Sequence, residues 1–208
     1  MVDQVRALAD VAGASEALDY QCSMVRDSWT AYADAHVAVM WVSIAAVKPL
    51  GRSVDRARLA RARRLLQELL EEKIPPFSAY TRGSADGIRV CLPPVLELWG
   101  ADFLIVDGMH RVAACLEIHS LSSISALVVT SSQLPPPTVE PCAWSQVEVV
   151  TGAQSRSEKF PGYEPTLFRP TAEYFDLHSN SYASVEDVLQ AASSGDAAGA
   201  GASRPDND

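Results

Sequence analysis

Residues 102–115 read DFLIVDGMHRVAAC, and this stretch decides the fold that we expect. Four apolar residues follow Asp102, which is typical of a buried strand. Gly108 comes directly after the strand, and residues 109–119 have the apolar spacing of a helix. The side chains of this helix that we expect to pack inward are Val112, Ala113, Cys115 and Leu116. The sequence therefore predicts a strand, a sharp turn and a helix in direct succession.

The turn between this strand and helix has the composition of an anion site. The first N–H groups of a helix have no acceptor within it and carry partial positive charge. Gly108 would let a phosphate approach the backbone of Met109, while His110 and Arg111 add side-chain donors. Asp107 would be repelled by the phosphate unless it binds Mg²⁺, takes a proton or grips another part of the ligand. Alternatively, Asp107 merely caps the helix and Arg111 pairs with a surface acid.

The chain before this stretch is predicted to contain helices and one strand. Residues 1–35 approximate helical spacing, with Gly13 separating two short helices. The run HVAVMWVSIAAV, residues 36–47, is rich in β-branched and aromatic side chains and predicts a buried strand.

A longer helix is predicted over residues 54–73. Ser53 or Asp55 would cap its start, and Ile74-Pro75-Pro76 would end it. One stripe of this helix is apolar and consists of Leu59, Ala62, Leu66 and Leu69. Its first part is basic: the window 52–64 has the six arginines Arg52, Arg56, Arg58, Arg61, Arg63 and Arg64.

Two further strands and a loop complete the predicted core. Residues 83–87 read as a turn or loop, and residues 89–98 as a strand in which Pro93-Pro94 forces an edge position or a bulge. Residues 124–129 read as another strand. The pattern indicates an α/β domain.

Residues 106–115, VDGMHRVAAC, resemble the signature turn of the ParB/sulfiredoxin superfamily, in which a strand leads into a pattern such as DGHHR, GGCHR or GERR and then a helix of small residues. The order of the elements over residues 41–130 is similar as well. The resemblance implies a small mixed sheet with flanking helices. It also implies that the turn binds the phosphates of ATP, ADP or CTP, and that Arg52 reaches the nucleotide from the facing loop.

The branches of this superfamily differ in chemistry. Sulfiredoxins have a catalytic Cys where this chain has Met109, so a thiolate reaction is not expected. The chromosome-partition branch adds a helix-turn-helix domain, for which residues after 130 show no helix pair. The free serine kinase branch shares the pattern Asp-Gly-x-His-Arg, which Asp107, Gly108, His110 and Arg111 match. Its supporting Glu is absent from the loop 48–55, where Asp55 would have to stand in.

The remaining arginines of the window 52–64 have a simpler interpretation. They are expected to form the solvent-facing side of the helix and to pair with Glu68, Glu71 and Glu72.

Residues 135–192 are expected to be irregular and rich in aromatics, and residues 193–208 to be disordered. Six of the eleven Phe and Tyr residues fall there: Phe160, Tyr163, Phe168, Tyr174, Phe175 and Tyr182. They would form a strap packed on the domain, or else a lid with Lys159 or Arg169 touching anions. A short helix is predicted from Ser184.

Composition and charge argue against several classes of protein. The 208 residues have a formal net charge of −9, which opposes DNA binding. No run is long and apolar enough to cross a membrane, and the N-terminus lacks a secretory signal pattern. The four cysteines form no CxxC pair, so a cytoplasmic protein without a structural zinc is expected.

The sequence thus predicts a helical extension (1–40), a ParB/sulfiredoxin-like domain (41–134), the irregular segment and the tail. The expected function is a nucleotide-dependent phosphotransferase or hydrolase that uses Mg²⁺ and acts on a small hydroxylated metabolite. Asp107 and His110 would be catalytic, and Asp107 the metal ligand. The residues expected to bind nucleotide are Gly108, Met109, His110, Arg111 and Arg52. The alternatives are a non-catalytic module that responds to CTP or ATP, and, last, a DNA-binding protein or nuclease.

Overall fold

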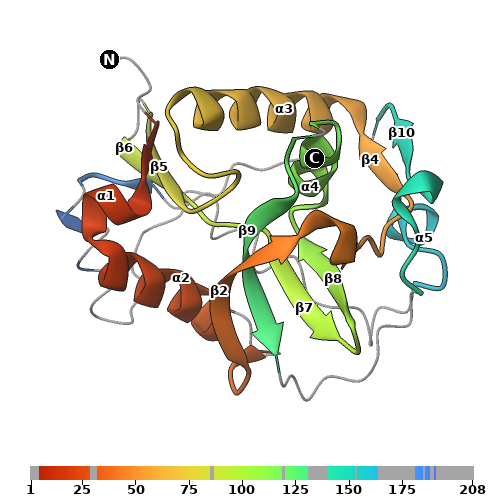
Figure 1. Cartoon of the computed structure of the whole chain (residues 1–208), viewed down its shortest axis with the longest axis horizontal. Coiled ribbons are helices and arrows are strands. Elements are labelled where there is room, and N and C mark those ends of the chain that lie inside the picture. Colours follow the sequence, from red (N-terminus) through yellow and green to blue (C-terminus); the bar gives the residue numbers. More distant parts are fainter. Residues whose placement is uncertain are drawn as a thin grey trace.

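A computed structural model describes the protein over residues 5–28, 32–84, 87–118, 120–130, 140–152, 154–163, 181–184, 186, 187 and 190. These residues form a mixed α/β structure with three sheets (Figure 1). The expected disordered tail, most of the short helix predicted from Ser184, and the residues Phe168, Arg169, Tyr174 and Phe175 lie outside the described residues. No helix in the described part is both long and apolar enough to span a membrane.

The largest sheet has five strands in the order β2-β9-β7-β8-β3. Its members are β2 (His36–Ser43), β9 (Ser123–Thr130), β7 (Val95–Trp99), β8 (Asp102–Asp107) and β3 (Val47–Lys48). β2 and β9 are antiparallel, as are β7 and β8, whereas β7 runs parallel to β9 and β3 parallel to β8. The sheet is therefore mixed, and β8 delivers the chain directly into the turn at Gly108.

The single strand predicted over residues 36–47 is wrong in one respect. β2 ends at Ser43, and the short 3₁₀ helix η2 (Ile44–Ala46) carries the chain to β3 on the opposite edge of the same sheet. Apolar side chains are needed in all three pieces, because Val42, Ile44 and Val47 are all buried in the same core. A continuous apolar run therefore did not reveal the break.

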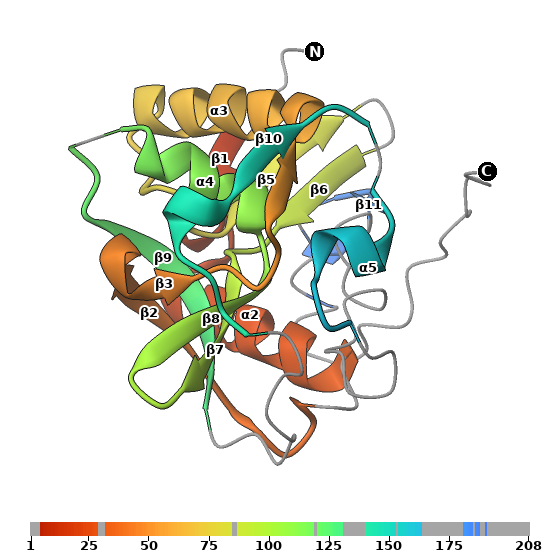
Figure 2. The same ribbon diagram turned by 90° about the vertical axis from the view of Figure 1, so that its right-hand side faces the viewer.

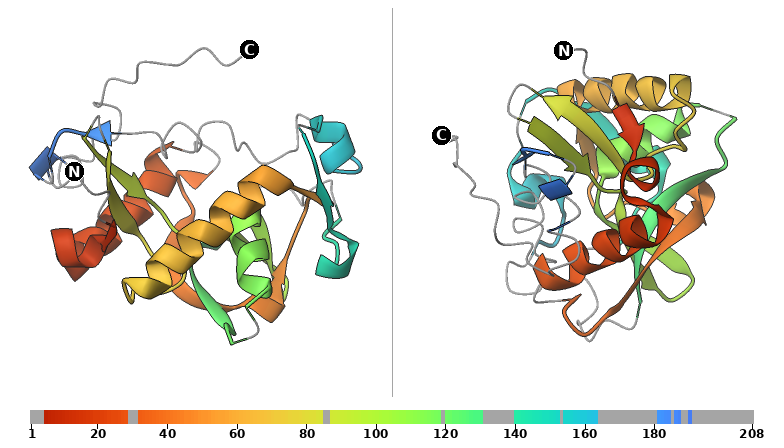
Figure 3. Two further views of the ribbon diagram at one scale, coloured as in Figure 1. Left: turned by 90° about the horizontal axis from the view of Figure 1, so that it is seen from above. Right: turned by 90° about the vertical axis from the view of Figure 1, so that its left-hand side faces the viewer.

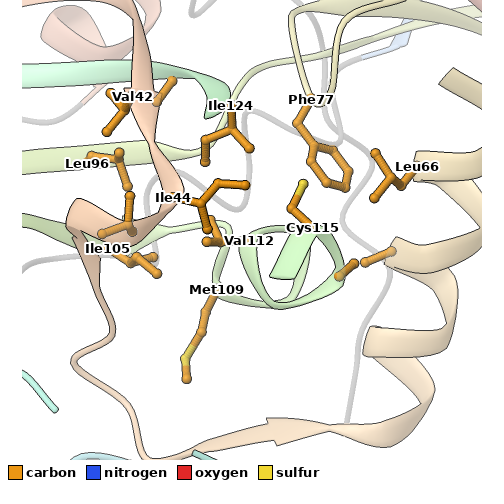
Figure 4. Close-up of a cluster of buried hydrophobic side chains, with 14 of the residues drawn as sticks. Val42, Ile44, Leu66, Phe77, Leu96, Ile105, Met109, Val112, Cys115 and Ile124 are labelled. Atoms are coloured by element: carbon orange, nitrogen blue, oxygen red, sulfur yellow. The ribbon is translucent and has the colours of Figure 1, made fainter. Parts of the chain in front are cut away.

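Two helices pack against this sheet and enclose the main core. α3 (Arg56–Glu71) buries the predicted stripe, and the Asp55 carboxylate caps it by accepting the Arg58 N–H at 2.8 Å. α4 (Met109–Leu116) lies between α3 and the sheet, and Val112 and Cys115 point into the core, as predicted (Figures 1 and 4).

A second, four-stranded sheet has the order β1-β5-β6-β11 and packs with the N-terminal helices. Its members and those helices are β1 (Val5–Ala7), β5 (Tyr80–Ser84), β6 (Gly87–Cys91), β11 (Ser181–Tyr182), α1 (Leu8–Ala12) and α2 (Ala14–Ser28). Gly13 separates the two helices, as predicted, with φ of 87°. β1 and β5 were not predicted, because each is short and has no clear alternation.

The strand predicted over residues 89–98 is wrong, because β6 and β7 lie in different sheets. Pro93 and Pro94 connect them and are buried at the junction. Proline cannot donate a ladder hydrogen bond, so the pair ends one strand instead of bulging it. The turn or loop predicted over residues 83–87 lies where β5 and β6 join as an antiparallel hairpin, and Gly83, Ser84 and Gly87 are part of its strands.

Within the segment predicted to be irregular, residues 140–152 and 154–163 contain three short elements. β10 (Glu148–Val150) runs parallel to β4 (Ser53–Asp55), and η3 (Trp144–Gln146) and α5 (Arg156–Lys159) flank it. Figure 2 shows β10 beside β4 with α5 close by. Figure 3 shows β10 and α5 at one end of α3, opposite the N-terminal helices. The Trp144 indole N–H donates to the Val47 carbonyl at 2.9 Å, which anchors this segment to the main sheet.

Candidate functional site

The turn after β8 has a conformation that requires glycine. Gly108 has φ of 93° and ψ of 18°, in the left-handed region. A Cβ placed on it would lie 2.8 Å from the Pro94 Cβ and 3.0 Å from the Pro94 Cα. The amides of Arg111 and Val112 donate to the Gly108 carbonyl at 2.9 and 3.0 Å. The N–H groups of Met109 and His110 come before these first donors and therefore have no acceptor within the helix.

A cavity of about 590 Å³ opens beside this turn. One side is formed by residues 107–111, here called the turn wall, and the facing side by residues 154–160, here called the C-terminal wall. Arg58 and Arg61 of α3 form a third side. The two walls meet at Gly51, where an added Cβ would lie 3.1 Å from the Phe160 ring and 3.2 Å from the Met109 sulfur. Figure 4 shows the Met109 side chain extending out of the core cluster.

Positive charge dominates the lining of the cavity. Among the described residues its cationic side chains are Arg58, Arg61, Arg111, Arg156 and Lys159, whereas Asp107 is the one carboxylate. These cations come from α3, α4 and α5, which are far apart in the sequence. A chain with net charge −9 has therefore gathered a local excess of four positive charges around one hollow, and such a hollow attracts anions.

Asp107 and Arg111 form an ion pair within the turn wall. Arg111 Nη2 lies 2.7 Å from Asp107 Oδ2, and Arg111 Nη1 donates to the Leu92 carbonyl. Both side chains are mostly buried, with exposed fractions of 14% and 11%. Asp107 therefore does not cap α4, and Arg111 pairs with Asp107 instead of a surface acid.

His110 is held as a neutral imidazole. Its Nε2 accepts the backbone N–H of Asp55 at 3.0 Å, so the ring proton resides on Nδ1. Burial and then the positive charges of Lys159 and Arg58 together lower the pKa of His110 to about 4, against the opposing effect of Asp55 and Asp107. His110 thus offers one N–H donor, while its other nitrogen already accepts a bond from the start of α3.

The arginines do not divide as the sequence indicated. Arg52 is exposed and does not line the cavity; its backbone positions the C-terminal wall by accepting the Glu148 N–H and donating to the Lys159 carbonyl. Arg58 and Arg61 are exposed, as expected, but they also line the cavity. Arg63 pairs with Glu117. The spacing of apolar residues in the sequence identifies the face of α3 that packs in the core. It does not show which of the polar faces of α3 lies beside a segment distant in the sequence.

The C-terminal wall contributes Lys159 and Phe160. The Lys159 Nζ lies 5.2 Å from the centre of the Phe160 ring. Burial lowers the pKa of Lys159, the positive charge of Arg58 lowers it further, and Asp107 opposes both. Phe160 packs against Leu50 and Leu104, which fixes the wall on the domain. Phe160 therefore packs on the domain, as the strap interpretation expected, while Lys159 lines the cavity.

The far end of the cavity is less charged and was not anticipated. Tyr80 of β5 and Cys91 of β6 line it together with Ile105 and Val106 of β8. Tyr80 and Cys91 share a hydrogen bond, and burial raises the pKa of both groups. The long separation of these strands from the turn in sequence left no local signal for this part of the site.

A smaller cavity of about 300 Å³ adjoins the first. The two share Arg58, His110, Gln154 and Lys159, and the smaller one also has Asp55 in its lining. Asp55, which would have to stand in for the missing Glu of the loop 48–55, thus lies near the turn. Its carboxylate is engaged as the cap of α3, and hydrogen bonds from backbone N–H groups lower its pKa.

The described residues contain no group of three or more His, Cys, Asp or Glu side chains arranged to hold a metal ion. Asp107, the predicted Mg²⁺ ligand, lies beside a guanidinium instead of a second carboxylate. Mg²⁺ is usually bound through one or two carboxylates together with substrate phosphates and waters. The Asp107 carboxylate is already paired with a guanidinium, and this fixed positive charge does not fit a divalent cation.

No model of a known protein family matches this chain, and a search of curated proteins also found no match.

Proposed function

We propose that the protein is a nucleotide-binding protein of the ParB/sulfiredoxin type, and that its cavity holds the phosphates of a nucleoside di- or triphosphate. One observation carries the proposal: the open N-terminus of α4 and five cationic side chains from three helices converge on one hollow. Helix N-termini and arginine forks are the groups that proteins use to bind phosphate.

The topology is compatible with the superfamily resemblance. A mixed sheet leads through β8 and a left-handed glycine into a short helix of small residues, and a basic helix packs beside it. A terminal phosphate beside the Met109 and His110 N–H groups would lie between α4 and the Lys159 ammonium. The less polar end near Tyr80 would then be open to the uncharged part of the ligand.

Phosphotransfer to a small hydroxylated metabolite is the second candidate, and Asp107 favours it. Its carboxylate adjoins the turn that would hold the phosphate. In such a reaction the acceptor oxygen attacks the terminal phosphorus, the bond to the bridging oxygen breaks, and the hydroxyl proton passes to Asp107. His110 is less suited to this proton transfer, because its Nε2 already accepts the Asp55 N–H.

Thermal unfolding with ATP, ADP, CTP or GTP tests the binding proposal. A ligand at one hundred times its Kd adds about 2.7 kcal/mol to the free energy of unfolding, which raises the midpoint by several degrees. Arg64→Gln is the matched control, because Arg64 lies on the same helix as Arg58 but outside both cavities of the site. Absence of stabilisation by every nucleotide, with and without Mg²⁺, would contradict the proposal.

Product analysis of the stabilising nucleotide then separates the two candidates. A binding module leaves the nucleotide intact, whereas a phosphotransferase converts it when a pool of hydroxylated metabolites is supplied. Asp107→Asn should keep nucleotide binding and lose any turnover. A mobility-shift assay with duplex DNA at low and moderate salt tests the DNA alternative, which the net charge disfavours.

A further inference from the structure

We infer that the cavity binds its polyphosphate ligand as the free anion, with arginine and lysine side chains neutralising the charge that Mg²⁺ would otherwise neutralise. This inference rests on the proposed nucleotide function and specifies the form of the ligand. It replaces the Mg²⁺ that the sequence placed at Asp107.

The carboxylates near the cavity are both engaged. Asp107 lies 2.7 Å from the Arg111 guanidinium, so a divalent cation on its oxygens would sit next to a fixed positive charge. Asp55 faces the adjoining cavity, and its Oδ1 accepts the Arg58 N–H at 2.8 Å as the cap of α3. A Mg²⁺ ion recruited by either group would have to displace these contacts.

Four of the five cations of the lining differ from Arg111, which pairs with Asp107. Within the part of the chain that the structure describes, no carboxylate forms an ion pair with Arg58, Arg61, Arg156 or Lys159. A free nucleoside triphosphate carries about four negative charges at neutral pH, and its Mg²⁺ complex about two. The excess of four positive charges around the cavity matches the free anion better than the metal complex.

Two of these cations act on the same space. Arg58 and Lys159 line both cavities, and the positive charge of Arg58 lowers the pKa of Lys159. Both also lower the pKa of the His110 imidazole that lies between the two cavities. A polyanion between Arg58 and Lys159 would relieve their mutual repulsion, whereas Mg²⁺ in the same place would increase it.

Calorimetric titration of the full chain with ATP tests the inference, once in EDTA and once with excess Mg²⁺. We expect binding in EDTA and about tenfold weaker binding with Mg²⁺, because the metal removes charge that the cavity would otherwise contact. Inorganic tripolyphosphate in EDTA should bind as well, since the recognised feature is the chain of phosphates.

Variants connect this effect to named side chains. Lys159→Met should weaken ATP binding in EDTA about tenfold, while Arg64→Gln on the outer part of α3 should leave it within about twofold. Asp107→Asn should tighten binding in EDTA by a few-fold, because it removes the one negative charge of the lining. If Asp107 were a metal ligand, the same substitution would weaken binding in Mg²⁺.

The outcomes separate this inference from the proposed function. Binding of ATP that requires Mg²⁺ overturns the inference and leaves the nucleotide proposal standing. Weaker binding by Asp107→Asn in Mg²⁺, with no gain in EDTA, also overturns it. Failure of ATP, CTP, ADP and GTP to bind under either condition contradicts the nucleotide proposal itself. Binding in EDTA that Mg²⁺ weakens and Lys159→Met reduces supports the inference.

Discussion

The turn wall and the C-terminal wall face each other across one cavity, but they arise from the chain in different ways. The turn wall is five consecutive residues, from Asp107 to Arg111, whose positions follow from the strand before them and the helix after them. The C-terminal wall exists only because β10 pairs with β4, nearly one hundred residues earlier in the chain. Local sequence therefore specifies the first wall, and tertiary pairing specifies the second.

The comparison shows which part of the site is rigid and which part is less tightly held. The turn wall contains a mostly buried ion pair and a glycine in close contact with Pro94, so few of its atoms can move. The C-terminal wall consists of exposed or half-buried side chains on a four-residue helix, attached through a few backbone bonds, one indole and one phenyl ring. Substitutions in the turn wall should therefore lower the stability of the protein more than substitutions in the C-terminal wall.

Removal of Arg111 should have the largest effect. Arg111→Ala leaves the mostly buried Asp107 unpaired and the Leu92 carbonyl without this donor, so the free energy of unfolding should fall by about 2–4 kcal/mol. ATP affinity should fall about a hundredfold, because a phosphate donor is lost and an uncompensated carboxylate remains. Urea denaturation and calorimetry measure the two quantities.

Arg63→Ala is the control for this substitution. Arg63 pairs with Glu117 on the exposed side of α3, and its loss should cost less than about 1 kcal/mol. Equal losses of stability for Arg111→Ala and Arg63→Ala would show that the turn wall is no more rigid than the surface.

The glycine of the turn wall should come next. Gly108→Ala places a methyl group against the Pro94 backbone at a positive φ, and we expect a loss of about 2–3 kcal/mol of folding free energy. Gly100→Ala is the matched control, since Gly100 has φ of 62° but nothing within 4 Å of an added Cβ. That control should lose about 1 kcal/mol. Similar losses of stability for both variants would show that the contact with Pro94 adds nothing to the cost of the positive φ.

The pH dependence of stability reports the contact between the walls and α3. The pKa of His110 falls from 6.5 to about 4 on folding, so the unfolded chain binds the proton more tightly. The contribution of His110 to the free energy of unfolding is therefore complete above about pH 6.5 and is lost as the pH falls towards 4. Because the ring is partly exposed, we expect about 1–2 kcal/mol.

Denaturation curves of His110→Gln between pH 7 and pH 4 should show a shallower decline than those of the unchanged protein. Gln retains an acceptor for the Asp55 N–H but does not titrate. His36→Gln, on the exposed start of β2, provides the comparison. If the stability of His110→Gln declined in parallel with that of the unchanged protein, burial and the nearby cations would not lower the pKa of His110 as stated.

The smallest effect should come from the anchor of the C-terminal wall. Trp144→Phe removes the indole donor to the Val47 carbonyl but keeps most of the packing, so about 1 kcal/mol of stability should be lost. ATP affinity should decrease more than stability alone would indicate, because the position of Lys159 depends on this attachment. Unchanged affinity would mean that the wall is held by β10 and Phe160 without the indole.

Much of the fold could be predicted from the residues, because its signals are local. The α3 stripe, the cap at Asp55, the break at Gly13 and the succession of β8, Gly108 and α4 all follow from spacing within a few turns of chain. The split between β6 and β7 was missed, since Pro93-Pro94 is compatible with either a bulge or a strand end until the partner strands are known.

The site was predicted for the turn wall and missed elsewhere for the same reason. Tyr80 and Cys91 reach the cavity only through a hairpin in another sheet, and Arg58 and Arg61 only because a distant segment borders their helix face. β10 is three residues long, and nothing in Glu148–Val150 indicates a parallel partner at Ser53–Asp55.

The parallel pairing of β10 with β4 has a consequence during biosynthesis. Ribosomes release a chain from its N-terminus, so α3 and the Gly108 turn can fold well before Lys159 has been made. A nascent or truncated polypeptide without α5 would present the start of α4 and the arginines Arg58, Arg61 and Arg111, but not Arg156 or Lys159. If the cavity binds nucleotide as proposed, tight capture of the ligand waits until translation has passed α5, and cellular nucleotide would stabilise long products over interrupted ones.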